Sequence, residues 1–106
     1  MKMMVSQIGF KLSKIDKVME LSINLPVDTK ILSVSAEKEY DEYVPWAHYI
    51  APSNDIFKTG HREFNFIIVN CKYTEVEIDK HEYIGNIDIE DETYTVFFKA
   101  GKVIRE

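Results

Sequence analysis

The run of residues 63–72 constrains this chain most, because no other stretch is as long, as apolar and as rich in β-branched and aromatic side chains. Successive side chains of a strand point to opposite faces. Its apolar side chains fall on both faces: Phe64, Phe66 and Ile68 on one, and Ile67 and Val69 on the other. Periodicity alone also permits a helix, but the β-branched centre favours a strand. We therefore predict a buried strand with both faces covered.

The composition is that of a soluble globular protein. The chain has 106 residues, of which 45% are hydrophobic and 29% charged, and we predict a single β-rich domain over residues 1–106. No stretch approaches the roughly 18 apolar residues of a membrane span, and the first residues lack the apolar run of a signal peptide. The sequence therefore indicates a cytoplasmic protein that does not bind membranes.

Charge and cysteine content exclude several classes of partner. The net charge of -5 argues against binding of long nucleic acids, which needs a concentrated field of Lys and Arg. The negative net charge is compatible with a small anionic ligand, because two or three local basic groups can hold a phosphate. Cys71 is the only cysteine, so an intrachain disulfide and a zinc site of several cysteines are both excluded.

The first part of the chain alternates in the manner of antiparallel strands. Apolar and polar side chains alternate partly in residues 3–12 and most regularly in residues 19–25. A turn at Pro26 leads to residues 30–38, whose inward side chains we expect to be Leu32, Val34 and Ala36. We predict that residues 19–25 and 30–38 form a hairpin.

Proline and charged residues mark the middle of the chain. Pro45 lies within residues 44–50 and predicts an edge strand or a strand start, because proline cannot donate to a ladder. Residues 52–62 read as the longest loop, which carries Lys58, His61 and Arg62. Loops on a rigid sheet often hold binding groups, so this loop is the first functional candidate.

The last part predicts a second hairpin. In residues 80–89, Tyr83, Gly85, Ile87 and Ile89 are expected on one face. The acidic residues 90–92 form a solvated turn before the β-rich residues 93–99, and the tail 100–106 either frays or adds an edge. The fold class is therefore all-β, a single small antiparallel sandwich or partly open barrel of about six to eight strands.

No catalytic or metal-binding motif is found. The nucleophile elbow, the Walker loop and the dinucleotide fingerprint are all absent. His48, His61 and His81 lie too far apart in sequence for a ligand motif, although they can converge in space. Cys71 closes an apolar strand and is expected to be a small buried hydrophobe. We predict a protein that is not an enzyme and that has no metal and no cofactor.

Aromatic and basic residues support binding of a nucleotide. Such a ligand needs aromatic faces for its bases and cations for its phosphates. The candidate residues are Trp46, Tyr49, Lys58, His61, Arg62 and Lys80. The alternatives are that Trp46 packs in the core and that Lys58 and Arg62 belong to a solvated loop. For Tyr83 and Tyr94, core packing with the hydroxyl at the surface is favoured.

Several short motifs resemble a family of small phage-encoded proteins of uncharacterised function. They are the Pro26 turn before I-L-S-V at 31–34, the W-A pair at 46–47, T-G-H at 59–61, Y-I-G at 83–85 and V-F at 96–97. The resemblance implies a phage protein made in the host bacterial cytoplasm, with an accessory role against the host. Some small phage proteins of this kind are sponges that sequester nucleotide signals of antiphage defence.

This resemblance leads to one hypothesis and two alternatives. The hypothesis is a homo-oligomer that binds a cyclic nucleotide at its subunit interfaces. Trp46 or a nearby tyrosine would stack on a base, and Lys58, Arg62 or Lys80 would hold phosphate. The first alternative is an acidic protein that inhibits a host factor by surface mimicry or addition to a sheet edge. The second is a small virion-associated protein.

Overall fold

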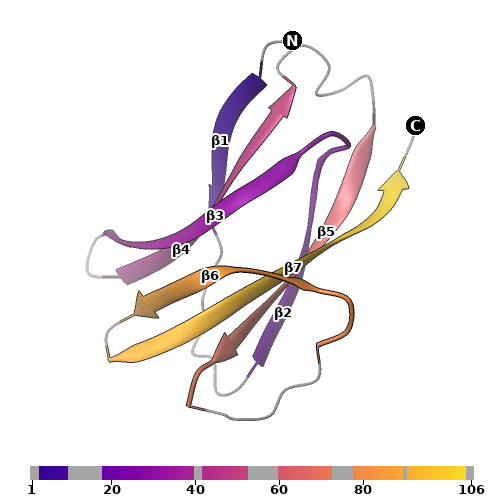
Figure 1. Ribbon diagram of the computed structural model, residues 1–106. Coiled ribbons are helices and arrows are strands. Elements are labelled where there is room, and N and C mark those ends of the chain that lie inside the picture. Colours follow the sequence, from indigo (N-terminus) through magenta and orange to yellow (C-terminus); the bar gives the residue numbers. More distant parts are fainter. Residues whose placement is uncertain are drawn as a thin grey trace.

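Seven strands form two antiparallel sheets that pack face to face in the computed structural model (Figure 1). The structure describes residues 3–9, 18–39, 42–52, 60–72, 78–89 and 91–104, and none of them is helical. The strands are β1 (Met3–Gly9), β2 (Val18–Pro26), β3 (Lys30–Glu39), β4 (Glu42–Pro52), β5 (His61–Asn70), β6 (Glu82–Ile89) and β7 (Glu92–Ile104). Sheet A has the order β1-β4-β3 and sheet B the order β2-β5-β7-β6. The predicted all-β sandwich is confirmed.

Strand β5 is the buried strand that the sequence predicts. It lies between β2 and β7 in sheet B. Phe64, Phe66 and Ile68 are buried on its inner face. Ile67 and Val69 are buried on its outer face. A strand whose centre is apolar on both faces is stable in water only when both faces are covered. This explains the central position of β5 in sheet B.

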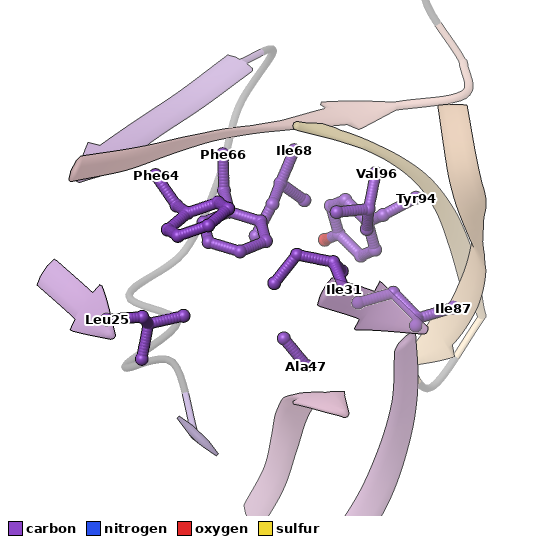
Figure 2. Close-up of a cluster of buried hydrophobic side chains, with 9 residues drawn as sticks. All are labelled: Leu25, Ile31, Ala47, Phe64, Phe66, Ile68, Ile87, Tyr94 and Val96. Atoms are coloured by element: carbon purple, nitrogen blue, oxygen red, sulfur yellow. The ribbon is translucent and has the colours of Figure 1, made fainter. Parts of the chain in front are cut away.

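The core lies between the two sheets, where side chains from both point toward one another (Figure 2). Sheet B supplies most of the large side chains, and sheet A supplies Ile31 and Ala47. The ring centroids of Phe66 and Phe98 lie 6.4 Å apart. Burial of this apolar surface is the main favourable contribution to folding.

Strands β2 and β3 do not form the predicted hairpin. Strand β2 pairs with β5, and β3 pairs with β4. The turn between them, closed by a 3.0 Å hydrogen bond from the Thr29 amide to the Pro26 carbonyl, carries the chain from sheet B to sheet A. Each of these strands has one apolar face. In separate sheets, both apolar faces turn toward the same core.

Strand β4 is the centre of sheet A, so the predicted edge position of residues 44–50 is wrong. It lies between β1 and β3. The central position tolerates Pro45 because the described pairing with β1 ends at Gly9 and Trp46. Among the described pairs, Pro45 has a partner only in β3, where it lies opposite Ala36. Its missing amide therefore does not interrupt the described ladder with β1.

Two irregularities reverse the predicted faces of side chains. The register of β3 shifts between Ile31 and Ser33, so Ile31 is buried and Leu32 is 47% exposed instead of pointing inward. The register of β6 shifts between Tyr83 and Gly85. Tyr83 is therefore 60% exposed and packs edge-on against Phe97, not in the core. An inserted residue shifts the alternation of the strand by one position.

The hairpin of β6 and β7 is confirmed, and β7 is longer than predicted. It continues to Ile104, which pairs with His61 at the start of β5. Strand β6 is parallel to β5, because each of them pairs antiparallel with β7. The chain must therefore cross sheet B between them. A 2.6 Å hydrogen bond from His81 Nε2 to Asn65 Oδ1 holds the end of this crossover on the outer face of the sheet.

Candidate functional site

The structure separates most of the predicted site residues. Trp46 and Tyr49 both lie in β4, but alternation places them on opposite faces of sheet A. His61 and Arg62 begin β5 and do not belong to a loop, and they lie on opposite faces of sheet B. Lys80 is exposed in the crossover between β5 and β6. Lys58 lies outside the described residues. The five described candidates therefore do not form one pocket within a single subunit.

Trp46 lies on the outer face of sheet A and not in the core. Its six-membered ring covers Gly9 of the neighbouring edge strand, where a Cβ atom would lie 3.0 Å from Cζ3 of the ring. An aromatic ring over an edge glycine stabilises strand pairing. The indole Nε1 is shielded from solvent and has no hydrogen-bond partner. Trp46 therefore belongs to the surface of sheet A.

Arg62 faces the space between the two sheets at one end of the sandwich. It lies opposite Leu25 of β2 and Val103 of β7, and it shares the inner face of β5 with Phe64. Its Nε is shielded from solvent and has no hydrogen-bond partner within the described part of the chain. A buried donor without an acceptor costs about 1–3 kcal/mol, and more when the group is charged. An anionic ligand would supply the missing acceptor.

Two further candidate groups lie at the same end of the sandwich. Thr29 belongs to the turn after β2, and its hydroxyl is also shielded without a hydrogen-bond partner. Tyr49 lies on the inner face of sheet A, pairs with Ile31 and packs against the core. We call Arg62, Thr29 and Tyr49 together the Arg62 end. It combines a guanidinium, a hydroxyl and an aromatic ring.

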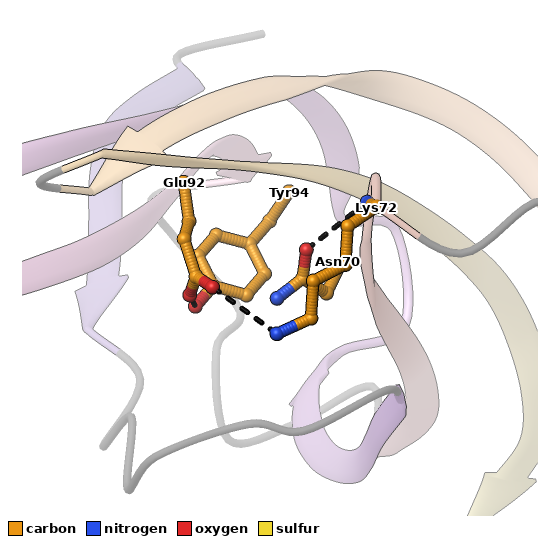
Figure 3. A network of polar contacts seen from close by, with 4 residues as sticks. All are labelled: Asn70, Lys72, Glu92 and Tyr94. Atoms are coloured by element: carbon orange, nitrogen blue, oxygen red, sulfur yellow. Dashed lines mark hydrogen bonds and ion pairs between the residues drawn. The ribbon is translucent and has the colours of Figure 1, made fainter.

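Sequence reasoning missed a polar network at the opposite end of the sandwich (Figure 3). The Tyr94 hydroxyl donates to Glu92 Oε2 at 2.7 Å, and Lys72 Nζ lies 3.3 Å from Glu92 Oε1. The Lys72 amide donates to Asn70 Oδ1 at 3.2 Å. Tyr94 is buried in the core, as predicted. Glu92 therefore ties the end of β5 to the start of β7, although the sequence predicts only a solvated turn there.

The network lowers the pKa of the Glu92 carboxyl below its ordinary value. The largest cause is the hydrogen bond from Tyr94, followed by the Asn70 amide and the Lys72 ammonium. Asn70 is 1% exposed, but its Nδ2 makes no hydrogen bond of ordinary geometry. We therefore assign the lowered pKa chiefly to the Tyr94 hydroxyl, whose 2.7 Å contact is unambiguous.

Replacement of Glu92 by glutamine is expected to weaken the acid dependence of stability. Because the folded-state pKa is lowered, the carboxylate stabilises the fold above its ordinary pKa of 4.5, and this contribution is lost as the pH falls through the folded-state pKa. Urea denaturation of both proteins between about pH 3 and pH 7 measures the difference. Identical pH profiles would show that the hydrogen bonds to Glu92 contribute nothing to stability.

Cys71 is exposed and not buried as predicted. Its Sγ lies 3.0 Å from Thr95 Oγ1. The residue directly follows the last position of β5, where the chain leaves the sheet, so its side chain is not covered by a second layer. The structure therefore presents a free thiol at the surface.

Among the described residues, no three His, Cys, Asp or Glu side chains are grouped so that they could hold a metal ion. The described part of the chain contains no helix that is long and apolar enough to cross a membrane. Comparisons with protein families, curated proteins and solved structures find no match for this chain.

Proposed function

We propose that this chain is a non-enzymatic phage accessory protein that binds and sequesters a small nucleotide signal of bacterial antiphage defence. The ligand class is a cyclic oligonucleotide. The observation that carries this proposal is the Arg62 Nε, a shielded donor at an end of the sandwich that has no hydrogen-bond partner among the described residues. A sponge needs affinity and copy number, and it needs no catalytic group.

Each group of the Arg62 end has a role in this proposal. The guanidinium of Arg62 donates to a phosphate, for which its planar fork is well suited. The Thr29 hydroxyl, which also lacks a partner, donates a second hydrogen bond. The ring of Tyr49 packs against a base. Lys58, a further candidate from the sequence, precedes Arg62 closely in the chain and lies outside the described residues.

The proposed site is smaller than the set of residues that the sequence suggests. Trp46 lies on the outer face of sheet A, and Lys80 lies in the crossover on the outer face of sheet B. His61 points to the outer face at the start of β5. We therefore leave these three residues out of the phosphate site.

The proposed place of action is the host bacterial cytoplasm, where cyclic nucleotide signals are made. The exposed free thiol of Cys71 supports this compartment, because exposed thiols persist in a reducing environment. We propose that the protein acts there as a homo-oligomer.

Calorimetry against a panel of cyclic di- and trinucleotides and ADP-ribose derivatives tests the proposed function. We expect tight binding of at least one compound, and its recovery in unchanged form by chromatography after heat denaturation of the complex. Recovery of an altered compound would identify an enzyme instead. The absence of binding heat with the whole panel would overturn the proposal and favour an acidic inhibitor of a host protein.

A further inference from the structure

The outer face of sheet A presents exposed apolar side chains among its described residues. Val5 of β1 is 74% exposed there, and Met3 of the same strand is also largely exposed. Ile50 and Trp46 of β4 lie beside them on this face and are only half-buried. Leu32 is turned outward by the irregularity in β3. Contiguous exposed apolar surface of this kind marks an interaction site in soluble proteins.

The outer face of sheet B is different. Its central apolar residues Ile67 and Val69 are buried, whereas Val18 and Tyr83, on its two edge strands, are exposed. The end of the crossover is fixed to this face through His81 and Asn65. Asn65 also donates to Glu20 Oε1 at 3.0 Å, so this face has a polar network of its own. The two outer faces therefore differ at their centres, where sheet A presents the half-buried Trp46 and Ile50 and sheet B presents the buried Ile67 and Val69.

The charges on the outer face of sheet A lie near its two ends. Lys30 and Glu37 are both exposed, and they lie near opposite ends of β3. They pair with Ile50 and Val44, which share the Trp46 face of β4. At about 3.3 Å per residue, the two charges are roughly 20 Å apart.

The centre of this face carries no fixed charge. Its side chains there include Ser33, Ser35 and His48, and Ser35 Oγ lies 2.7 Å from His48 Nε2. Among the described side chains of this face, those at the centre are uncharged and partly apolar, and the exposed Lys30 and Glu37 lie toward the ends. Two copies of such a face are complementary in charge when the second copy is rotated by 180° so that its strands run in the opposite direction.

We propose that this face binds a second copy of the same chain in a two-fold symmetric dimer. The symmetry axis lies between the two faces and runs perpendicular to the strands. It reverses the strand direction of the second copy, so that Lys30 of each copy faces Glu37 of the other. A two-fold interface uses the same patch on both subunits and therefore requires such self-complementarity. The two sheets pack in the aligned manner of a β-sandwich.

The available area fits a dimer that dissociates readily. The three strands have 7, 10 and 11 residues. At about 3.3 Å per residue and about 4.8 Å between strands, they cover roughly 440 Å² per copy. The total of about 900 Å² lies just below the roughly 1,000 Å² of a specific interface. The inference deepens the homo-oligomer of the proposed function by naming its interface, and it does not involve the Arg62 end, which lies between the sheets and not on this face.

Sedimentation equilibrium over a range of protein concentrations tests the dimer. Lys30→Glu or Glu37→Lys alone places like charges opposite each other, and each should raise the dimer dissociation constant at least about tenfold. The double variant exchanges both charges and should restore the wild-type constant. A wild-type protein that is monomeric at every concentration would overturn the proposal, as would a double variant that dissociates like the single ones.

A pair of matched variants tests whether the face itself is buried. Val5→Glu places a charge in the interface and should also dissociate the dimer. Val18→Glu makes the same change at an exposed position of β2 in sheet B and should leave the dimer intact. Equal effects of both variants would refute the assigned face. Neither result depends on nucleotide binding, so the proposed dimer interface and the proposed nucleotide binding are tested independently of each other.

Discussion

Replacement of Phe66 by alanine is expected to lower the free energy of unfolding by about 3–5 kcal/mol. The side chain is fully buried at the centre of β5, between β2 and β7, and it packs near the ring of Phe98. The change removes apolar surface from the core and leaves a cavity that rigid sheets cannot close. Because small domains are stable by only about 5–15 kcal/mol, the variant should be close to unfolding at ambient temperature.

Urea denaturation followed by circular dichroism measures this effect. The control is Val18→Ala, which shortens a substantially exposed side chain in β2 and should change the free energy of unfolding by no more than about 0.5 kcal/mol. A loss below about 1 kcal/mol for the Phe66 variant would contradict a core centred on β5.

Replacement of Arg62 by glutamine is expected to weaken nucleotide binding at least about 30-fold. Loss of one partner of a buried, hydrogen-bonded charge pair costs about 2 kcal/mol or more, and each 1.4 kcal/mol corresponds to a factor of ten. The shielded Nε of Arg62 has no acceptor among the residues that the structure describes, so its truncation breaks no hydrogen bond of that atom to them. Calorimetry with the tightest ligand of the panel measures the loss.

Two further variants make this result specific. Arg62→Lys retains the charge but loses the planar fork, so it should bind with intermediate affinity. Lys80→Gln removes an exposed cation from the crossover and should bind as tightly as the wild type. Binding that is lost equally in the Arg62 and Lys80 variants would indicate general electrostatic attraction and not a site at the Arg62 end.

The sequence predicted the strands well because local patterns determine them. The apolar run in β5 has no polar face, so a buried central strand follows from its composition alone. The hairpin of β6 and β7 is also local, since a short turn joins its strands. The partners of β2 and β3 depend on residues distant in sequence, which periodicity does not reveal. The shifts at Leu32 and Tyr83 are likewise invisible in an alternating pattern.

The candidate site was harder to predict, because nearness in sequence is a poor guide to nearness on a sheet. Trp46 and Tyr49 are three positions apart, and an odd separation on a strand places side chains on opposite faces. The same rule separates His61 from Arg62. Conversely, Glu92 and Tyr94 are two positions apart and meet in a hydrogen bond. Applied to the predicted strand 44–50, this rule would have separated Trp46 from Tyr49. It could not have separated His61 from Arg62, because both were predicted to lie in a loop.

The most direct test of nucleotide binding at the Arg62 end is the nuclear magnetic resonance signal of the Arg62 Nε–H group. The chain contains two arginines, Arg62 and Arg105, so two such signals are expected, and the Arg62→Lys variant assigns them. The proposed function predicts that addition of a cyclic dinucleotide or trinucleotide from the panel shifts the Arg62 signal and leaves the Arg105 signal in place. An Arg62 signal that stays unchanged with every compound would contradict the proposed phosphate site.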